Sequence, residues 1–255
     1  MSAFQALVLG IVEGLTEFLP ISSTGHLILA AKLLGLAQTE FQKSFEIVIQ
    51  LGAIGAVVLL YWRQFLVPGV LARVLVAFLP TGAIGLAFYR LAKTYLLGNE
   101  SVVLLALFLG GVILIAFEVL HREPERAVAD VKSITYLQAI VIGFFQAVAI
   151  IPGVSRSGAT IVGGLAMGLN RETIVEFSFL LAVPTMIAAT GLDLVKNASS
   201  FSAGQSGALA VGFAAAFIVA MLSIKFLLAY VRTRTFIAFG VYRIIAAALF
   251  FMLVG

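Results

Sequence analysis

Two polar tracts in this chain carry the side chains that could do chemistry. The first, EGLTEFLPISSTGH at residues 13–26, holds two carboxylates, several hydroxyls and a histidine. The second, PGVSRSGAT at residues 152–160, holds one arginine among hydroxyls and glycines. Both are flanked by long apolar runs, and an arginine at the bilayer centre costs at least ~2.5–3.5 kcal/mol unless it is paired. Arg156 therefore requires an anionic partner, either a carboxylate or a ligand.

The two carboxylates of the first tract are four residues apart, which puts Glu13 and Glu17 on one face of a helix. Two ionised carboxylates at this spacing repel each other, so they need a cation between them. Ligation by oxygen atoms suits Mg²⁺ or Ca²⁺. The spacing therefore predicts a divalent-cation site, for magnesium or calcium, formed by Glu13 and Glu17.

The hydroxyl-rich ends of both tracts are expected to bind phosphate. Each one opens a helix, and a helix N-terminus offers unpaired N–H donors and the positive end of the dipole. The planar guanidinium of Arg156 also suits phosphate oxygens. A metal on one side and a guanidinium on the other form a clamp of the kind that neutralises developing charge in phosphoryl transfer. The residues expected to bind substrate are Ser22, Thr24, Gly25, Ser155, Ser157, Gly158 and Thr160.

The nucleophile is left open between a serine and water. A hydroxyl next to a base can be a nucleophile, and imidazole titrates near neutral pH. Ser23 is the preferred nucleophile because it is central in the first tract and close to His26 along the chain. A metal-activated water would use the same residues, and capping of helix ends explains single serines and threonines equally well. The predicted catalytic residues are Glu17, Ser23, His26 and Arg156.

Composition places these tracts inside a membrane protein. Of the 255 residues, 62% are hydrophobic and 11% are charged, against roughly 25% charged in a soluble domain. Apolar runs of about 20 residues, the length that crosses a bilayer, recur along the whole chain. The net charge of +4 does not indicate nucleic-acid binding, and the chain has no cysteine. Six membrane-spanning helices are predicted, at about 44–62, 74–92, 101–120, 174–194, 206–229 and 235–254.

Two further apolar regions, 4–36 and 137–170, are interrupted by proline and glycine. Pro20 and Pro152 cannot continue a helix because proline lacks the N–H group, and the serines that follow each proline can cap a second helix. Helix, break and second helix predict a re-entrant hairpin, whose irregular backbone survives at membrane depth only inside protein or beside a wet cavity. The polar region at 121–136 predicts an interfacial linker.

The interrupted regions match each other at an offset of 133 residues, with eight identities in thirty-one positions. The chain is therefore expected to be a single membrane domain with internal repeats at approximately 4–120 and 137–254. Three spans in each repeat invert the second relative to the first, and paired interrupted segments point to a midplane site where the hairpin tips meet. The predicted fold is an all-α integral membrane protein of six transmembrane helices and two re-entrant helical hairpins in an inverted-topology repeat.

Lysine and arginine counts predict the orientation, because cytoplasmic loops carry an excess of positive charge. Nine such residues are expected on the cytoplasmic face and five on the outer face, which both termini share. The cytoplasmic set is Arg63, Arg73, Arg122, Arg126, Lys132, Arg171, Lys225, Arg232 and Arg234. The outer set is Lys32, Lys43, Arg90, Lys93 and Lys196.

Other polar residues of the spans have more than one explanation. Glu46 and Gln50, one turn apart, and Glu176 could line the same cavity or lock helices together. Arg243, in the last predicted span, is expected to form a structural pair.

The two polar tracts resemble the signature motifs of the bacterial undecaprenyl-pyrophosphate phosphatases of the bacitracin-resistance type. The segments FEIVIQLGAI at 45–54 and FSFLLAVPTMIA at 177–188 are also similar to that family, and the likeness covers essentially the whole chain. The resemblance implies removal of the terminal phosphate from undecaprenyl diphosphate, giving the monophosphate carrier for cell-wall precursors. It also implies a divalent cation, a bacterial inner-membrane location and an active site open to the periplasmic side. By motif position it assigns importance to Glu13, Glu17, Ser23, His26, Arg156 and Thr160.

The alternative function is transport. Inverted repeats with broken helices that meet at the midplane are a transporter architecture, so the chain could flip polyprenyl phosphate or carry another anion. The acidic pair beside a histidine favours the phosphatase, because carrying an anion needs positive charge rather than carboxylates. The expected partners are the polyprenyl diphosphate substrate and membrane lipids, and formation of a homodimer is left open.

Overall fold

The computed structural model describes the chain except residues 38, 92–95, 97–98, 125, 198–205 and 255, together with the side chains of residues 40, 43, 89–91, 192–197 and 253–254. The described residues form α-helices and two short 3₁₀ helices, η2 (Val131–Ser133) and η3 (Val148–Ile150). The α-helices are α1 (Ala3–Thr16), α2 (Ser23–Leu33), α3 (Glu40–Phe65), α4 (Pro68–Leu91), α5 (Glu100–Leu120), α6 (Tyr136–Ala147), α7 (Arg156–Ala166), α8 (Arg171–Asn197), α9 (Ser206–Val231) and α10 (Ile237–Val254).

Five helices are long and apolar enough to cross a bilayer, counting only the described part of the chain. They lie in the first five predicted spans, at Ser44–Phe65, Pro68–Phe88, Glu100–Leu120, Arg171–Gly191 and Ser206–Val231. The sixth predicted span holds the shorter apolar helix α10, described with its side chains over Ile237–Met252. The chain is therefore an all-helical, multi-pass membrane protein.

Both predicted breaks are present. The chain turns between α1 and α2 at Pro20, and between η3 and α7 at Pro152. The cap predicted for the second break is confirmed, because the Ser155 hydroxyl accepts a hydrogen bond from the Gly158 N–H at 3.1 Å. The cap predicted for the first break is wrong. Ser22 makes no side-chain cap bond and has φ of 70°, a region that costs a non-glycine residue about 1–3 kcal/mol.

One glutamine ties the two helices of each broken pair together at the end away from the break. The Gln5 side-chain amide on α1 donates to the Leu34 carbonyl after α2 at 3.2 Å. The Gln138 side-chain amide on α6 donates to the Met167 carbonyl after α7 at 3.0 Å. These bonds fix the two arms of each pair side by side, so that each polar break forms the tip.

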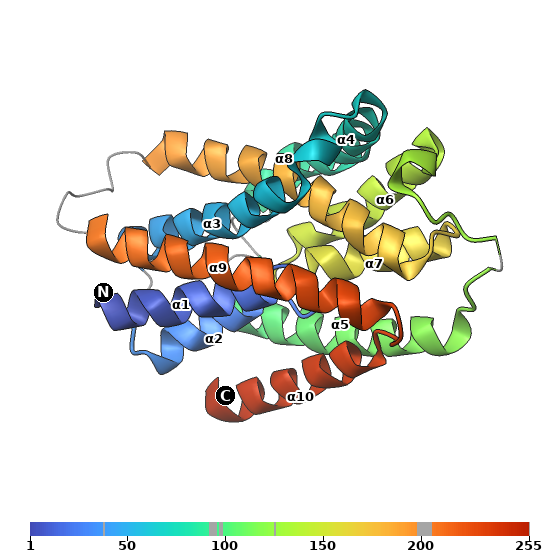
Figure 1. The fold of residues 1–255 in the computed structure, drawn as a ribbon. Coiled ribbons are helices and arrows are strands. Elements are labelled where there is room, and N and C mark those ends of the chain that lie inside the picture. The colour runs from blue at the N-terminus through green and yellow to red at the C-terminus, as the bar shows by residue number, and fades with distance from the viewer. Residues whose placement is uncertain (38, 92–95, 97–98, 125, 198–205, 255) are drawn as a thin grey trace.

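Long helices hold the two broken pairs in place (Figure 1). Helix α1 packs along α9, α6 along α4, and α5 along α10. Glycines allow the close approach, since a Cβ atom at Gly10 would overlap the Gly212 carbonyl and one at Gly143 would overlap the Ala77 carbonyl. Behind the first tip, the fully buried Phe18 ring meets a ring of α8 edge to face, at 5.3 Å between centroids. The tips are thus held by packing on more than one side.

The turns of the bundle fall at two ends. The α3–α4, α7–α8 and α9–α10 turns lie toward one end, while both termini and the α2–α3 turn lie toward the other (Figure 1). Among the positive residues used for the predicted orientation, Lys93 lies outside the described residues. The same holds for the side chains of Lys43, Arg90 and Lys196.

Candidate active site

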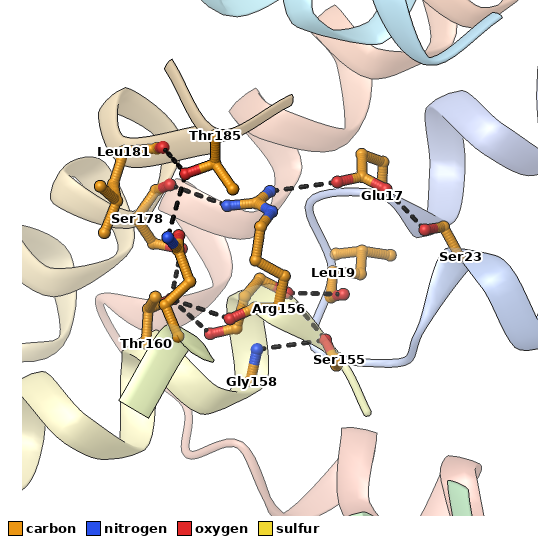
Figure 2. Close-up of polar contacts among 12 residues, drawn as sticks. Glu17, Leu19, Ser23, Ser155, Arg156, Gly158, Thr160, Ser178, Leu181 and Thr185 are labelled. Carbon is orange, nitrogen blue, oxygen red and sulfur yellow. Dashed lines mark hydrogen bonds and ion pairs between the residues drawn. The ribbon is translucent and has the colours of Figure 1, made fainter. Parts of the chain in front are cut away.

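An ion pair joins the two tips. The Arg156 guanidinium donates to a carboxylate oxygen of Glu17 at 3.2 Å, and the two side chains are 11% and 6% exposed. A second guanidinium nitrogen donates to the Ser178 backbone carbonyl of α8 at 3.1 Å (Figure 2). The anionic partner that Arg156 requires is therefore a carboxylate from the opposite half of the chain.

The carboxylate of Glu17 also holds the candidate nucleophile. The Ser23 hydroxyl, in the first turn of α2, donates to the other Glu17 oxygen at 2.5 Å (Figure 2). A separate bond between the tips runs from the Ser157 hydroxyl to the Leu19 carbonyl at 2.9 Å. One carboxylate thus fixes the positions of both a hydroxyl and a guanidinium, because it has one oxygen for each.

A polar cavity of about 170 Å³ opens at this junction. Residues of both tips that were predicted to form the site line it, together with side chains from the helices that surround the tips. The full lining is Glu17, Ser22, Ser23, Thr24, Gln50, Ala149, Val154, Ser155, Arg156 and Met186.

Other predicted substrate-binding residues lie behind the cavity wall. The Thr160 hydroxyl shares a 2.6 Å hydrogen bond with the Ser178 hydroxyl, which ties α7 to α8. Ser157 bonds across the tips, Gly158 donates its N–H to the cap, and Gly25 packs close to α5. These four residues shape and fix the tips without lining the cavity.

His26 has two hydrogen-bond partners in the described part of the chain, and neither of them is Ser23. One ring nitrogen lies 2.8 Å from the Ser22 carbonyl, and the other lies 2.7 Å from the Tyr242 hydroxyl on α10. The His26 and Tyr242 rings also stack, at 5.5 Å between centroids. His26 therefore supports the strained backbone of Ser22, beside the residue predicted to be the nucleophile, and does not line the cavity itself.

Glu13 is the residue that fits a metal ion best. It is fully buried, and neither of its carboxylate oxygens has a hydrogen-bond partner among the described residues. A buried carboxylate without hydrogen-bond partners is costly as an anion, so Glu13 must either be protonated or meet a cation. Within the described residues no three acidic, histidine or cysteine side chains cluster at metal-binding distance. A hard cation here would take the carboxylates of Glu13 and Glu17. Glu17 lines the cavity, whereas Glu13 lies behind its wall.

The other polar residues of the spans divide between the two explanations. Gln50 lines the cavity. Glu46 accepts a hydrogen bond from Gln42 on its own helix at 3.1 Å. Glu176 accepts from Gln64 at 3.4 Å, which links α8 to α3. Gln50 therefore belongs to the site, and Glu176 helps to lock α8 to α3.

Sequence reasoning missed Ser178 and Tyr242. Ser178 holds Arg156 through its carbonyl and Thr160 through its hydroxyl, and a serine within an apolar run was the available signal. Tyr242 lies on α10, and nothing near it along the chain links it to His26, 216 residues away.

The fold and the site together define a multi-pass membrane protein with a polar cavity lined by a carboxylate, hydroxyls and a guanidinium. The chain belongs to the bacitracin resistance protein BacA family, whose model matches residues 6–249. It is 53% identical to the undecaprenyl-diphosphatase of Wolinella succinogenes, over 98% of this chain and 97% of the relative. It is 50% identical to that of a Sulfurihydrogenibium species, over 99% of both chains, and 51% identical to that of Aquifex aeolicus, over 96% of both.

Proposed function

We propose that this chain is an undecaprenyl-diphosphatase, an integral-membrane phosphatase that removes the terminal phosphate from undecaprenyl diphosphate. The product is the monophosphate carrier that cell-wall synthesis uses again. Full-length similarity to curated undecaprenyl-diphosphatases supports the substrate. The observation that carries the chemistry is the contact of Glu17 with both Arg156 and Ser23 at the wall of a polar cavity.

The diphosphate binds in the cavity between the tips. Arg156 is held at the wall by Glu17 and Ser178, so its fork is already oriented when a phosphate arrives. The N–H groups in the first turns of α2 and α7 add donors and the positive ends of two helix dipoles. Preorganised donors of this kind stabilise charge on the phosphoryl oxygens without a reorganisation cost at the moment of reaction.

Either a water molecule attacks the terminal phosphorus directly, or Ser23 attacks it first and water then hydrolyses the resulting phosphoserine to release phosphate. Glu17 accepts the hydrogen bond of the Ser23 hydroxyl at 2.5 Å and is therefore the first acceptor of its proton. A bond forms between the attacking oxygen and the terminal phosphorus while the bond to the bridging oxygen breaks. The lipid monophosphate leaves with that electron pair. Because it is a good leaving group, positioning and charge neutralisation are the main demands on the protein.

Glu13 and Glu17 would hold the divalent cation, magnesium or calcium. The two partnerless oxygens of the buried Glu13 support this assignment. When bound, the cation polarises a phosphoryl oxygen and offsets negative charge.

His26 keeps the proposed role of proton carrier. The Tyr242 hydroxyl gives it a proton partner on α10, on the side away from the cavity. Because His26 bonds neither Ser23 nor Glu17, a proton from the reaction would reach it through water. One chain supplies every residue named in this mechanism.

The proposed architecture is an inverted repeat in which two re-entrant hairpins enter from opposite faces. Matching features at the 133-residue offset support it. Gly35 and Gly168 both have positive φ, 66° and 81°, after the second arm of each hairpin. Ser2 and Thr135 both form a capping box at the start of the first arm. The glutamine of each capping box is the residue that ties the two arms of its hairpin together. Each hairpin starts and ends at the same end of the bundle (Figure 1).

The proposed location is the bacterial inner membrane, with the cavity open to the periplasmic side. The α9–α10 turn carries Arg232 and Arg234, at the end of the bundle opposite both termini (Figure 1). Positive charge at that end supports a cytoplasmic assignment for it. The mouth of the first hairpin then faces outward with the termini.

Phosphate release from a polyprenyl diphosphate by the purified protein in detergent tests the proposed function. We expect release that is abolished by a chelator and restored by Mg²⁺ or Ca²⁺. Glu13→Gln should raise the metal concentration for half-maximal rate by at least about tenfold, because one of two carboxylate ligands loses its charge. A folded protein that releases no phosphate at any metal concentration would contradict the proposal and favour a transporter.

Replacing Ser23 by alanine separates the two nucleophiles. If the serine attacks, Ser23→Ala should lower kcat by at least about a thousandfold, as expected for loss of a nucleophile. Rapid-quench measurement of a phosphorylated protein intermediate gives an independent readout. A residual rate within about tenfold of the parent would assign the attack to water, with Ser23 as a positioning group.

A further inference from the structure

Arg243 is the second arginine at the junction of the tips, and the proposed mechanism does not use it. It lies on α10, it is 2% exposed, and it does not line the cavity. Its guanidinium donates to the Leu107 and Ala106 carbonyls of α5, at 3.2 and 3.0 Å. These bonds fix the arginine against α5, so that the rest of its fork points at the tips.

The remaining donors of Arg243 reach one carbonyl from each tip. The Pro20 carbonyl of the first tip accepts at 3.3 Å, and the Gly153 carbonyl of the second tip accepts at 3.2 Å. Each break frees backbone carbonyls from the helical bonding pattern, and a buried carbonyl without a donor is costly. One side chain therefore satisfies a carbonyl of each break and sets the spacing between the two tips.

The structural pairing expected for Arg243 is made with backbone carbonyls. Among the described residues, its partners are backbone carbonyls, and no carboxylate forms an ion pair with it. Carbonyls satisfy its donors but do not cancel its charge. Arg156, by contrast, is neutralised by Glu17.

The sequence explains how the Arg243 side chain fits between α10 of the second repeat and α5 of the first. At the 133-residue offset, the position equivalent to Arg243 is Gly110. The two equivalent residues touch, because a Cβ atom at Gly110 would overlap the Arg243 guanidinium. Two arginines could not occupy facing positions, so one half supplies the guanidinium and the other supplies the space for it.

We infer that Arg243 is a positioning residue that holds the two tips in register by bonding the Pro20 and Gly153 carbonyls, so that Glu17 and Arg156 face one phosphate. This inference rests on the proposed phosphatase function for its catalytic consequence. Its structural consequence, a fixed distance between the tips, can be measured without activity.

The kinetic test compares three variants with a matched control. Arg243→Met removes the donors and should lower kcat by about 100-fold, the loss expected for a misplacement of ~1 Å in a site of this kind. Arg243→Lys keeps the charge, but a single ammonium cannot reach the Pro20 and Gly153 carbonyls together while it also bonds α5, so kcat should again fall by at least about tenfold. Gly110→Ala keeps the arginine but displaces its guanidinium, and should lower kcat by at least about tenfold.

Gly85→Ala is the control for the glycine substitution. Gly85 lies in the apolar helix α4, and a methyl group added there would point into open space, with nothing within 4 Å. The variant should therefore keep kcat within about threefold of the parent. Equal activity of Gly110→Ala and Gly85→Ala would overturn the inference. This comparison decides the matter even if Arg243→Met fails to fold.

A cross-linking measurement gives the readout that a merely stabilising residue would not move. The chain has no cysteine, so a Thr24→Cys, Val154→Cys pair across the cavity reports only on the tips. A short bifunctional thiol reagent should cross-link this pair at least about fivefold more slowly with Arg243→Met or Gly110→Ala than with Gly85→Ala, because the tips no longer keep one spacing. Unchanged cross-linking would overturn the inference. If the protein without substitutions releases no phosphate but cross-linking of the cysteine pair still depends on Arg243, the phosphatase function alone is contradicted.

Discussion

Replacing Glu17 by glutamine is expected to lower kcat by at least about a thousandfold, because one change removes the charge that several groups share. The carboxylate accepts from Ser23 at 2.5 Å and from Arg156 at 3.2 Å. Each bond goes to a different carboxylate oxygen, and glutamine replaces one of these oxygens by an NH₂ donor, so one of the two bonds is lost. The guanidinium would then be buried without a counter-charge, which is strongly destabilising for a pair of this kind.

The measurement is phosphate release by purified, monodisperse protein, together with its thermal unfolding. Glu176→Gln is the matched control, since it also removes a carboxylate from an apolar helix. The Glu176 carboxylate bonds Gln64, and Glu176 does not line the cavity. We expect the control to keep kcat within about threefold. A folded Glu17→Gln protein with more than a tenth of the parent rate would remove Glu17 from the mechanism.

Replacing Arg156 by lysine should lower kcat/KM by at least about 100-fold although the charge is conserved. The guanidinium reaches the Ser178 carbonyl with one nitrogen and Glu17 with another. A lysine ammonium is a single point donor and cannot span both partners while also facing a phosphate. Planar, bidentate recognition is the property that is lost.

Arg232→Lys is the control for this substitution. Arg232 forms an exposed ion pair with Glu172 at 2.5 Å, in the turn region after α9. Pairs of this kind contribute about 0–1 kcal/mol, so activity should not change measurably. Activity of Arg156→Lys equal to that of Arg232→Lys would show that only the positive charge matters at position 156.

Several features of this protein could be predicted from the sequence because they depend on local chemistry. The length of an apolar run decides whether a helix can cross a bilayer, so the spans could be predicted from hydropathy. Proline lacks the N–H group that continues a helix, so the breaks at Pro20 and Pro152 could be predicted as well. An arginine in apolar surroundings needs an anionic partner, so the sequence predicts such a partner for Arg156 without identifying it.

The choice of partners was decided only by the tertiary structure. Arg156 contacts Glu17, which is 139 residues away, while Glu13 is left without a partner among the described residues. Ser23 bonds Glu17 although His26 is closer along the chain. These choices depend on side-chain directions at two tips that different helices hold in place, and no local pattern contains that information.

The two serines that follow the breaks show the same division. Ser22 and Ser155 are equivalent at the 133-residue offset, and sequence alone predicts the same cap for both. Ser155 forms it, whereas Ser22 takes a strained conformation in which His26 bonds its carbonyl. The sequence by itself determined a membrane protein with two polar breaks of opposite charge. The tertiary structure decided which groups meet, because burial makes each polar atom bond to the neighbour that packing brings within reach.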